Sequence, residues 1–192
     1  MKKITTILFL LTIGFANAQA FKGKGDIKFQ VGANIQKWGT GITATSDFGL
    51  GENISYGFSA TYLLNTKKYT TYGGYASEAA FLAANPTYDP AIDGAITPTT
   101  AKAKFEDRID LRARFNANIG NVLNISDKLD VYPGLDLGLR NFGAHLGARY
   151  FFTEGFGMYS EAGFPLAKYG SSDGFKTLNN QFVFQIGATF NL

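Results

Sequence analysis

The stretch KFEDRIDLRARFNAN, residues 104–118, alternates apolar and polar side chains almost without interruption. Its apolar positions are Phe105, Ile109, Leu111, Ala113, Phe115 and Ala117, broken by Asp107, and its polar positions are Glu106, Arg108, Asp110, Arg112, Arg114 and Asn116. A helix would spread the arginines around its surface, whereas a strand turns successive side chains to opposite faces. The stretch therefore predicts a β-strand with one apolar and one charged face.

Seven further segments repeat this pattern, and turn residues separate them. They are residues 25–38, 40–50, 54–64, 128–140, 141–152, 156–164 and 182–192. A tilted strand needs roughly 9–11 residues to cross a bilayer, and these segments meet that length. Pro133 lies on an apolar face and is expected at a bulge or at a position without a ladder partner. Together the eight segments predict an all-β fold, a closed eight-stranded antiparallel up-and-down transmembrane β-barrel.

The connections between these segments are of two kinds. Two are long, at about residues 65–104 and 165–180, and both follow odd-numbered segments. The connections after even-numbered segments are shorter: GEN at 51–53, IGNVLNISD at 119–127 and TEG at 153–155. Outer-membrane barrels place long loops outside and short turns in the periplasm. We therefore expect the two long loops to face outward, both termini to be periplasmic, and EAAFLAA at 78–84 to form a short helix in the first loop.

The amino-terminal residues have the composition of a secretory signal peptide. MKKITTILFLLTIGFANAQA has two lysines, an apolar run from Ile4 to Phe15, and small residues ending at Ala18. This predicts a signal peptide at residues 1–18 and a mature barrel at 19–192. Removing the signal peptide lowers the formal net charge from +3 to +1, since it holds two lysines and no carboxylate. Such a small charge gives no reason to expect a nucleic-acid partner, and the lack of cysteine excludes thiolate chemistry.

The polar faces of the segments carry as many cations as carboxylates. We predict that these faces line the lumen as an ion-paired network, since eight strands enclose just enough space for side chains to fill. The predicted network is Lys28, Asp47, Glu106, Arg108, Asp110, Arg112, Arg114, Asp130, Asp136, Arg140, His145, Arg149 and Glu161. The apolar faces would then meet lipid. Aromatic residues near segment ends predict interfacial girdles: Trp38, Phe48, Tyr62, Tyr150, Phe152, Phe156 and Phe164.

The last segment, FVFQIGATFNL at 182–192, is expected to close the barrel against the first, because a barrel leaves no free edge. With the signal ending ANAQA and the hairpin GARYFFTEGFGMYSEAGF at 147–164, it resembles the small eight-stranded outer-membrane barrels of the outer membrane protein A and X type. The closest likeness is to those of Gram-negative Bacteroidetes-like bacteria. The resemblance implies outer-membrane lipid as surroundings and recognition of the terminal strand by the barrel-assembly machinery. Here the aromatic residue Phe190 is followed by Asn191 and Leu192, which departs from the usual terminal aromatic.

No catalytic, cofactor or metal site is predicted. Asp89 and Asp93 match no calcium loop, and a solvated turn is the simpler interpretation. The main hypothesis is a structural or surface-interaction role through the outer loops, carried by Tyr69, Tyr72, Tyr75, Phe81 and Tyr88, with an unidentified extracellular ligand. One alternative is a narrow channel for small solutes. A further alternative is a lipid A-modifying enzyme, in which His145 would act with Ser171 or Ser172 and Asp173.

Overall fold

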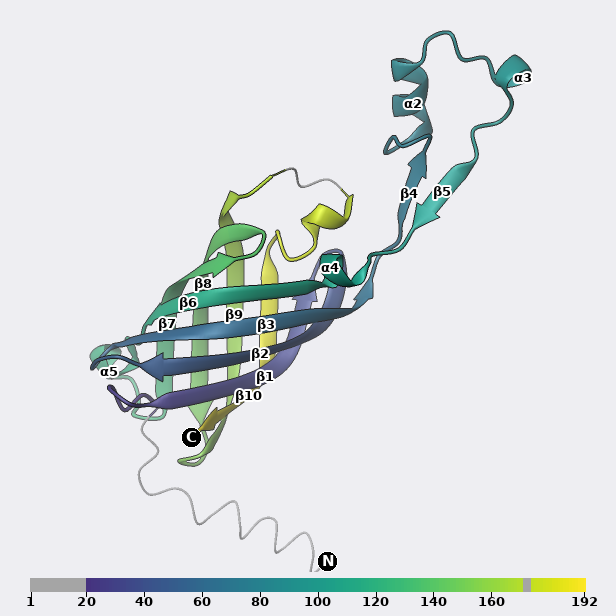
Figure 1. Cartoon of the computed structure of the whole chain (residues 1–192). Coiled ribbons are helices and arrows are strands. Elements are labelled where there is room, and N and C mark those ends of the chain that lie inside the picture. Colours follow the sequence, from purple (N-terminus) through teal and green to yellow (C-terminus); the bar gives the residue numbers. More distant parts are fainter. Residues whose placement is uncertain (1–19, 171–173) are drawn as a thin grey trace, which may run out of the picture.

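The eight predicted segments form eight antiparallel strands that close into a barrel (Figure 1). A computed structural model describes residues 20–170 and 174–192. The barrel strands are β1 (Ile27–Gln36), β2 (Gly39–Gly49), β3 (Ile54–Thr66), β6 (Ile109–Ala117), β7 (Leu129–Gly138), β8 (Asn141–Phe151), β9 (Phe156–Lys168) and β10 (Val183–Asn191). The predicted all-β fold, a closed eight-stranded antiparallel barrel, is confirmed.

The last strand closes the barrel, as its sequence predicts. β10 pairs with β9 on one side and with β1 on the other. The β1–β10 register runs from Lys28 opposite Asn191 to Gln36 opposite Val183. Every barrel strand therefore has two hydrogen-bonded neighbours, and the sheet has no open edge.

The polar faces point inward and the apolar faces point outward. In β3, the side chains of Ser55, Ser59 and Thr61 are buried, whereas Phe58 between them is 57% exposed. The same inversion holds around the barrel, since the exposed large residues include Val31, Ile42, Leu111, Leu137, Leu146, Met158 and Ile186. A barrel folded for water would place these side chains inside.

The two ends of the barrel differ (Figure 1). At one end, called the arm end, β4 (Tyr69–Tyr72) and β5 (Pro98–Ala101) pair and project from the barrel with α2 (Glu78–Ala84) and α3 (Pro90–Asp93). We call residues 69–101 the arm. α2 is the short helix expected at EAAFLAA, and the Ser77 hydroxyl caps it by accepting from the Ala80 N–H at 3.1 Å. The opposite end, the α5 end, carries α5 (Gly120–Leu123) and the carboxyl terminus.

Two boundaries differ from those predicted by more than two residues. Residues 105–108 form a helical turn, α4 (Phe105–Arg108), so β6 begins at Ile109. β9 continues to Lys168, three residues past Pro165, where a loop was expected to begin. A register shift between Phe142 and Gly143 of β8 accommodates Pro165, because Gly143 pairs with Pro165 and Phe142 with Ala167. A bulge is one of the few positions where a sheet tolerates proline.

Pro133 has a ladder partner on one side only, so it lies neither at a bulge nor at a fully unpaired position, the two alternatives predicted. It pairs with Leu146 of β8, whereas the β7 pairs with β6 run only from Gly138 to Gly134. Pro133 is thus one residue beyond the ladder with β6, so its missing N–H breaks no ladder hydrogen bond there.

Aromatic rings gather at the α5 end of the outer surface. One row of ring contacts joins Phe29, Phe190, Phe156, Phe152 and Tyr150, with centroid distances of 5.6–6.4 Å. Another joins Phe48 with Tyr56 at 5.3 Å. At the arm end, Trp38 is 39% exposed and Tyr62 contacts Phe105 at 5.6 Å. The predicted girdle positions therefore lie near the two ends of the apolar surface.

Within residues 20–170 and 174–192, no helix combines the length and apolarity required to cross a bilayer. The predicted signal peptide lies outside the described residues and stays a prediction.

Candidate functional site

Arg114 on β6 lies in the middle of the lumen and is buried. Its guanidinium meets Glu161 of β9 with two contacts: Nη2 is 2.6 Å from Oε2, and Nη1 is 3.3 Å from Oε1. Its Nε lies 3.6 Å from Oδ1 of Asp47 on β2. A two-pronged arginine–carboxylate contact fixes orientation as well as distance. Arg114 therefore ties together three strands that are not neighbours in the sheet.

Arg149 on β8 is the second buried cation of the network, and it is fully enclosed. Its Nε donates to Asp130 at 3.0 Å, Nη1 to Asp47 at 3.2 Å and Nη2 to the Asn118 side-chain oxygen at 3.0 Å. Its guanidinium carbon lies 4.1 Å from the centroid of the Tyr132 ring, a cation–π contact. Asp47 joins both arginines, so the two clusters form one network.

His145 on β8 uses both ring nitrogens within this network. Its Nδ1 is 2.9 Å from Oδ2 of Asp136, and its Nε2 is 2.8 Å from Oδ1 of Asn116 and 3.0 Å from Nη2 of Arg114. The side chain is buried beneath these groups. Ser171, Ser172 and Asp173, its suggested catalytic partners, lie outside the described residues. Both ring nitrogens of His145 are thus engaged by polar groups of the lumen.

The α5 end of the lumen is covered by the segment that leads into β1. Lys28 pairs with Asp26 and with the side-chain oxygen of Asn191. Its Nζ lies 5.9 Å from the centroid of Phe21 and 5.2 Å from that of Phe151, and both rings are buried. The apolar rings and the ion pair together fill this mouth.

The arm end is covered by residues 174–181, which we call the plug; its first part is the 3₁₀ turn η1 (Gly174–Thr177). Asn179 is buried and has a left-handed backbone with φ of 57°, which asparagine tolerates. Its N–H donates to Gln36 at 2.8 Å, and its carbonyl oxygen accepts from Arg112 and Asn141, each at 2.8 Å. Arg112 also pairs with Asp110 at 2.6 Å. The plug is therefore bound to the barrel wall on several strands.

The space left inside the network is small. A cavity of about 20 Å³ lies below the plug, lined by Asp110, Arg112, Arg114, Asp136 and Glu161 among others. That volume holds roughly one water molecule. The lumen is a packed interior, as expected for eight strands.

The network differs in membership from the predicted one. The structure places Lys28, Asp47, Asp110, Arg112, Arg114, Asp130, Asp136, His145, Arg149 and Glu161 inside the barrel, with Arg112 at the mouth. The prediction is wrong for Glu106 and Arg108, which belong to α4, and for Arg140, which lies in the β7–β8 turn. Glu106 is mostly exposed and 4.0 Å from Lys104, Arg108 donates to the Ala103 carbonyl at 3.2 Å, and Arg140 donates to the Glu106 carbonyl at 2.5 Å.

These changes remove the predicted balance of charge. Among the described residues, the barrel interior holds four cations, Lys28, Arg112, Arg114 and Arg149, against six carboxylates, Asp26, Asp47, Asp110, Asp130, Asp136 and Glu161. Neutral donors and acceptors that sequence reasoning did not place in the network complete it: Asn116, Asn118, Tyr132, Asn141 and Asn179. Asn116 and Tyr132 lie on the polar side of the alternation, and this position is the sequence signal that could have placed them in the lumen.

The aromatic residues of the arm pack largely on one another. The Phe81 ring contacts Tyr75 at 5.7 Å and Tyr88 at 5.0 Å, both edge-to-face. Tyr69 contacts Phe175 of the plug at 6.1 Å, and Tyr72 ends β4. The five recognition candidates thus form no single surface: three make a small aromatic cluster and Tyr69 lies at the base of the arm.

Asp89 and Asp93 are used locally. Asp89 caps α3 by accepting from the Ala91 N–H at 2.9 Å, and Asp93 accepts from the Asp89 N–H at 2.9 Å. Across the described part of the chain, no cluster of three or more histidine, cysteine or acidic side chains could hold a metal ion.

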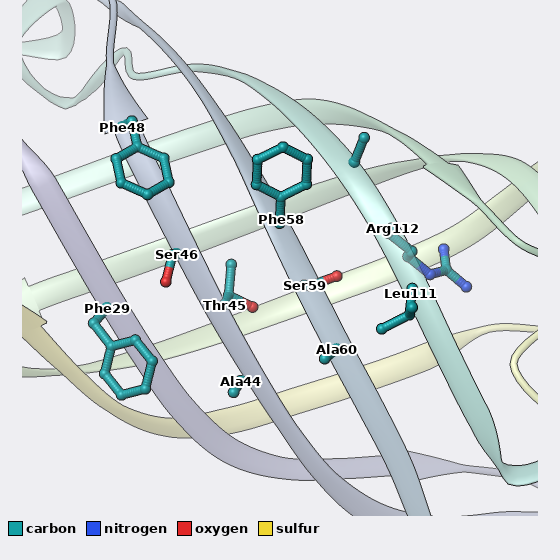
Figure 2. A pocket seen from close by; sticks show the side chains of 11 residues that line it. Phe29, Ala44, Thr45, Ser46, Phe48, Phe58, Ser59, Ala60, Leu111 and Arg112 are labelled. Atoms are coloured by element: carbon teal, nitrogen blue, oxygen red, sulfur yellow. The ribbon is translucent and has the colours of Figure 1, made fainter. Parts of the chain in front are cut away.

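The outer wall has one broad apolar hollow over β1, β2, β3 and β6. Its volume is about 660 Å³, and Figure 2 shows three phenylalanine rings, Phe29, Phe48 and Phe58, around the small side chains Ala44 and Ala60. The hollow arises because Ala44 and Ala60 are paired across β2 and β3.

These features define a closed β-barrel with an ion-paired interior and an apolar outer wall. The chain belongs to a family of unknown function, DUF6646, whose model matches residues 11–78 and 73–192. No curated protein matches the chain.

Two solved structures are similar to it. One, described as "De novo design of transmembrane beta-barrels", is 8% identical with a TM-score of 0.48, and 89% of this chain and 98% of that chain are covered. The other, described as "Asymmetric conductivity of engineered proteins", is 12% identical with a TM-score of 0.25, and 86% and 44% are covered. The fold described above rests on the strand register of this chain alone.

Proposed function

We propose that this protein is an integral outer-membrane β-barrel with a closed lumen, serving a structural or surface-interaction role through its arm. The inversion of its faces carries the proposal: charged groups are buried inside, and large apolar side chains cover the outside. In water this outer wall would be an exposed apolar surface far larger than monomeric soluble proteins present. In a bilayer this wall meets acyl chains, and the closed sheet satisfies the backbone hydrogen-bonding groups of every strand.

Placement of single labels tests the membrane proposal. The chain contains no cysteine, so a substituted cysteine is the only thiol. Nitroxide-labelled Phe58→Cys and Ala60→Cys should collide freely with oxygen dissolved in the bilayer, and Ser59→Cys between them should not. Uniform access to a water-soluble relaxing agent at all three positions would contradict the proposal.

The predicted signal peptide at 1–18 and the resemblance of residues 147–164 to outer-membrane barrels of the A and X type support export to the outer membrane. The arm end would then face outward, and the α5 end the periplasm, where the barrel-assembly machinery is the expected partner of β10. An epitope inserted at Gly94 in the arm should be detected on intact cells, whereas one at Gly155 in the β8–β9 turn should require permeabilisation. The reverse result would invert the orientation.

A narrow channel is the second candidate, and the packing disfavours it. The plug and the segment before β1 cover the two mouths, and the interior cavity is about 20 Å³. We expect no steady unitary currents from the purified protein in planar bilayers. Steady currents would contradict a closed lumen. The buried contacts of His145 likewise favour a structural role over lipid A chemistry.

A further inference from the structure

The two rims of the barrel differ strongly in charge. Excluding the arm, the arm-end rim carries nine cations: Lys37, Lys67, Lys68, Lys102, Lys104, Arg108, Arg140, Lys168 and Lys176. We call this set the collar. Among the described residues, the carboxylates on that rim are Glu106 and Asp107. The rim at the α5 end is balanced, with Lys22, Lys24 and Lys128 against Glu52, Asp127 and Glu154. The collar lies directly beyond the end of the apolar wall.

The collar surrounds a hollow that combines lysines with aromatic rings. Its volume is about 160 Å³, and its lining includes Trp38, Lys67, Lys68, Tyr69 and Phe175. This is smaller than the roughly 300–1,000 Å³ of pockets that enclose drug-sized ligands, and it suits a compact group. A second hollow of about 230 Å³ on the same rim is lined by Arg140, Lys176 and Tyr169 among others.

Two of these lysines lie over the Trp38 ring. Nζ of Lys67 lies 5.0 Å from the ring centroid, and Nζ of Lys37 lies 5.5 Å from it. In the described part of the chain, neither lysine forms an ion pair with a carboxylate, and nor does Lys68. Two ammonium groups thus lie over one amphipathic ring that is 39% exposed, and Lys68 lines the same hollow. Tryptophan and lysine are the residues that anchor proteins at a membrane interface.

We propose that the collar binds the phosphate groups of a phosphorylated glycolipid in the outer leaflet, with the Trp38 hollow as one binding site. Ammonium groups bind phosphate as point charges, and clusters of them recognise anionic lipid surfaces. A lipid fits better than a free anion because the collar lies at the strand ends next to exposed apolar side chains such as Ile42 and Leu64, where the acyl chains of the same molecule would lie. This inference rests on the proposed membrane barrel with its arm end outward.

Trp38 is the only tryptophan in the chain, so its fluorescence reports on this site alone. The test uses the full barrel refolded in phosphatidylcholine bicelles and titrated with bisphosphorylated lipid A. We expect a saturable change in Trp38 emission, and none with lipid A from which both phosphates have been removed. The double variant Lys67→Gln, Lys68→Gln should weaken binding roughly thirtyfold, as expected for two lysines near an anionic surface. The matched control, Lys22→Gln, Lys24→Gln at the α5 end, should bind like the unchanged protein.

Equal responses to phosphorylated and dephosphorylated lipid, or unchanged binding by the Lys67/Lys68 variant, would overturn the proposal. So would an equal response to inorganic phosphate, which would identify a free anion as the ligand. Each sample is also run unboiled and boiled on a gel. Loss of the heat-dependent mobility shift would contradict the membrane barrel, whereas a retained shift without a Trp38 response contradicts the lipid site alone.

Discussion

Replacing Arg149 by methionine should destabilise the barrel more than any change at its rims. Arg149 is fully buried, and it donates to Asp130 at 3.0 Å and to Asp47 at 3.2 Å. Without Arg149, Asp47 would still have Arg114 as an ion-pair partner at 3.6 Å. Asp130 has no other ion pair among the described residues. Breaking a buried pair by removing one partner leaves an uncompensated charge and costs about 3–5 kcal/mol. Methionine replaces the aliphatic part of the side chain but not the guanidinium over Tyr132, so the stranded carboxylate charge and the lost cation–π contact both contribute.

The assay is equilibrium unfolding in urea of the barrel refolded in phosphatidylcholine vesicles, followed by Trp38 fluorescence. Adding Asp130→Asn to the Arg149→Met variant removes the stranded charge and should recover at least ~1–2 kcal/mol. Arg140→Met at the arm-end rim is the matched control, and its effect should stay within about 1 kcal/mol. A cost below ~1 kcal/mol for Arg149→Met, or no recovery in the double variant, would refute a network held by paired buried charges.

Two further substitutions test the lipid-facing wall and the lumen packing. Phe58→Arg places a charge on the outer wall and should lower the free energy of unfolding by about 2–4 kcal/mol in the same assay. Ile92→Arg in the arm is the control and should be near neutral. Equal effects of the two substitutions would argue against lipid contact. Gly147→Ala would bring a Cβ within 2.1 Å of the Tyr132 ring and should cost about 1–3 kcal/mol. Gly155→Ala meets nothing within 4 Å and should change stability by less than about 0.5 kcal/mol, so similar unfolding curves for these two variants would contradict the packing described.

The strands were predictable because the period-two alternation is strong and long. The strand prediction failed at residues 105–108, because four residues of alternation are compatible with one helical turn as well as with a strand. Asp107 was the signal: it broke the apolar face, and in the structure its carboxylate accepts from the Lys104 N–H at 2.9 Å. The early end predicted at Pro165 failed for another reason: β9 continues past Pro165 through a register shift that leaves Leu166 unpaired, and the register of two strands cannot be read from one.

Which residues line the lumen was easier to predict than which of these residues contact one another. Alternation assigned Arg149 and Asp130 to the polar face, and the β7–β8 register makes them neighbours. The contacts of Arg149 with Asn118 and Asp47 cross the lumen and depend on the closed shape of the whole barrel. The plug was missed because residues 174–181 carry no alternation, and Asn179 is buried only through hydrogen bonds to strands far away in sequence.

The most direct test of the membrane barrel is the gel mobility of the outer-membrane fraction, compared before and after boiling. A closed barrel resists detergent, so the protein should be found in that fraction and should migrate anomalously until it is heated. A protein recovered in the soluble periplasmic fraction with identical mobility before and after boiling would contradict the membrane barrel.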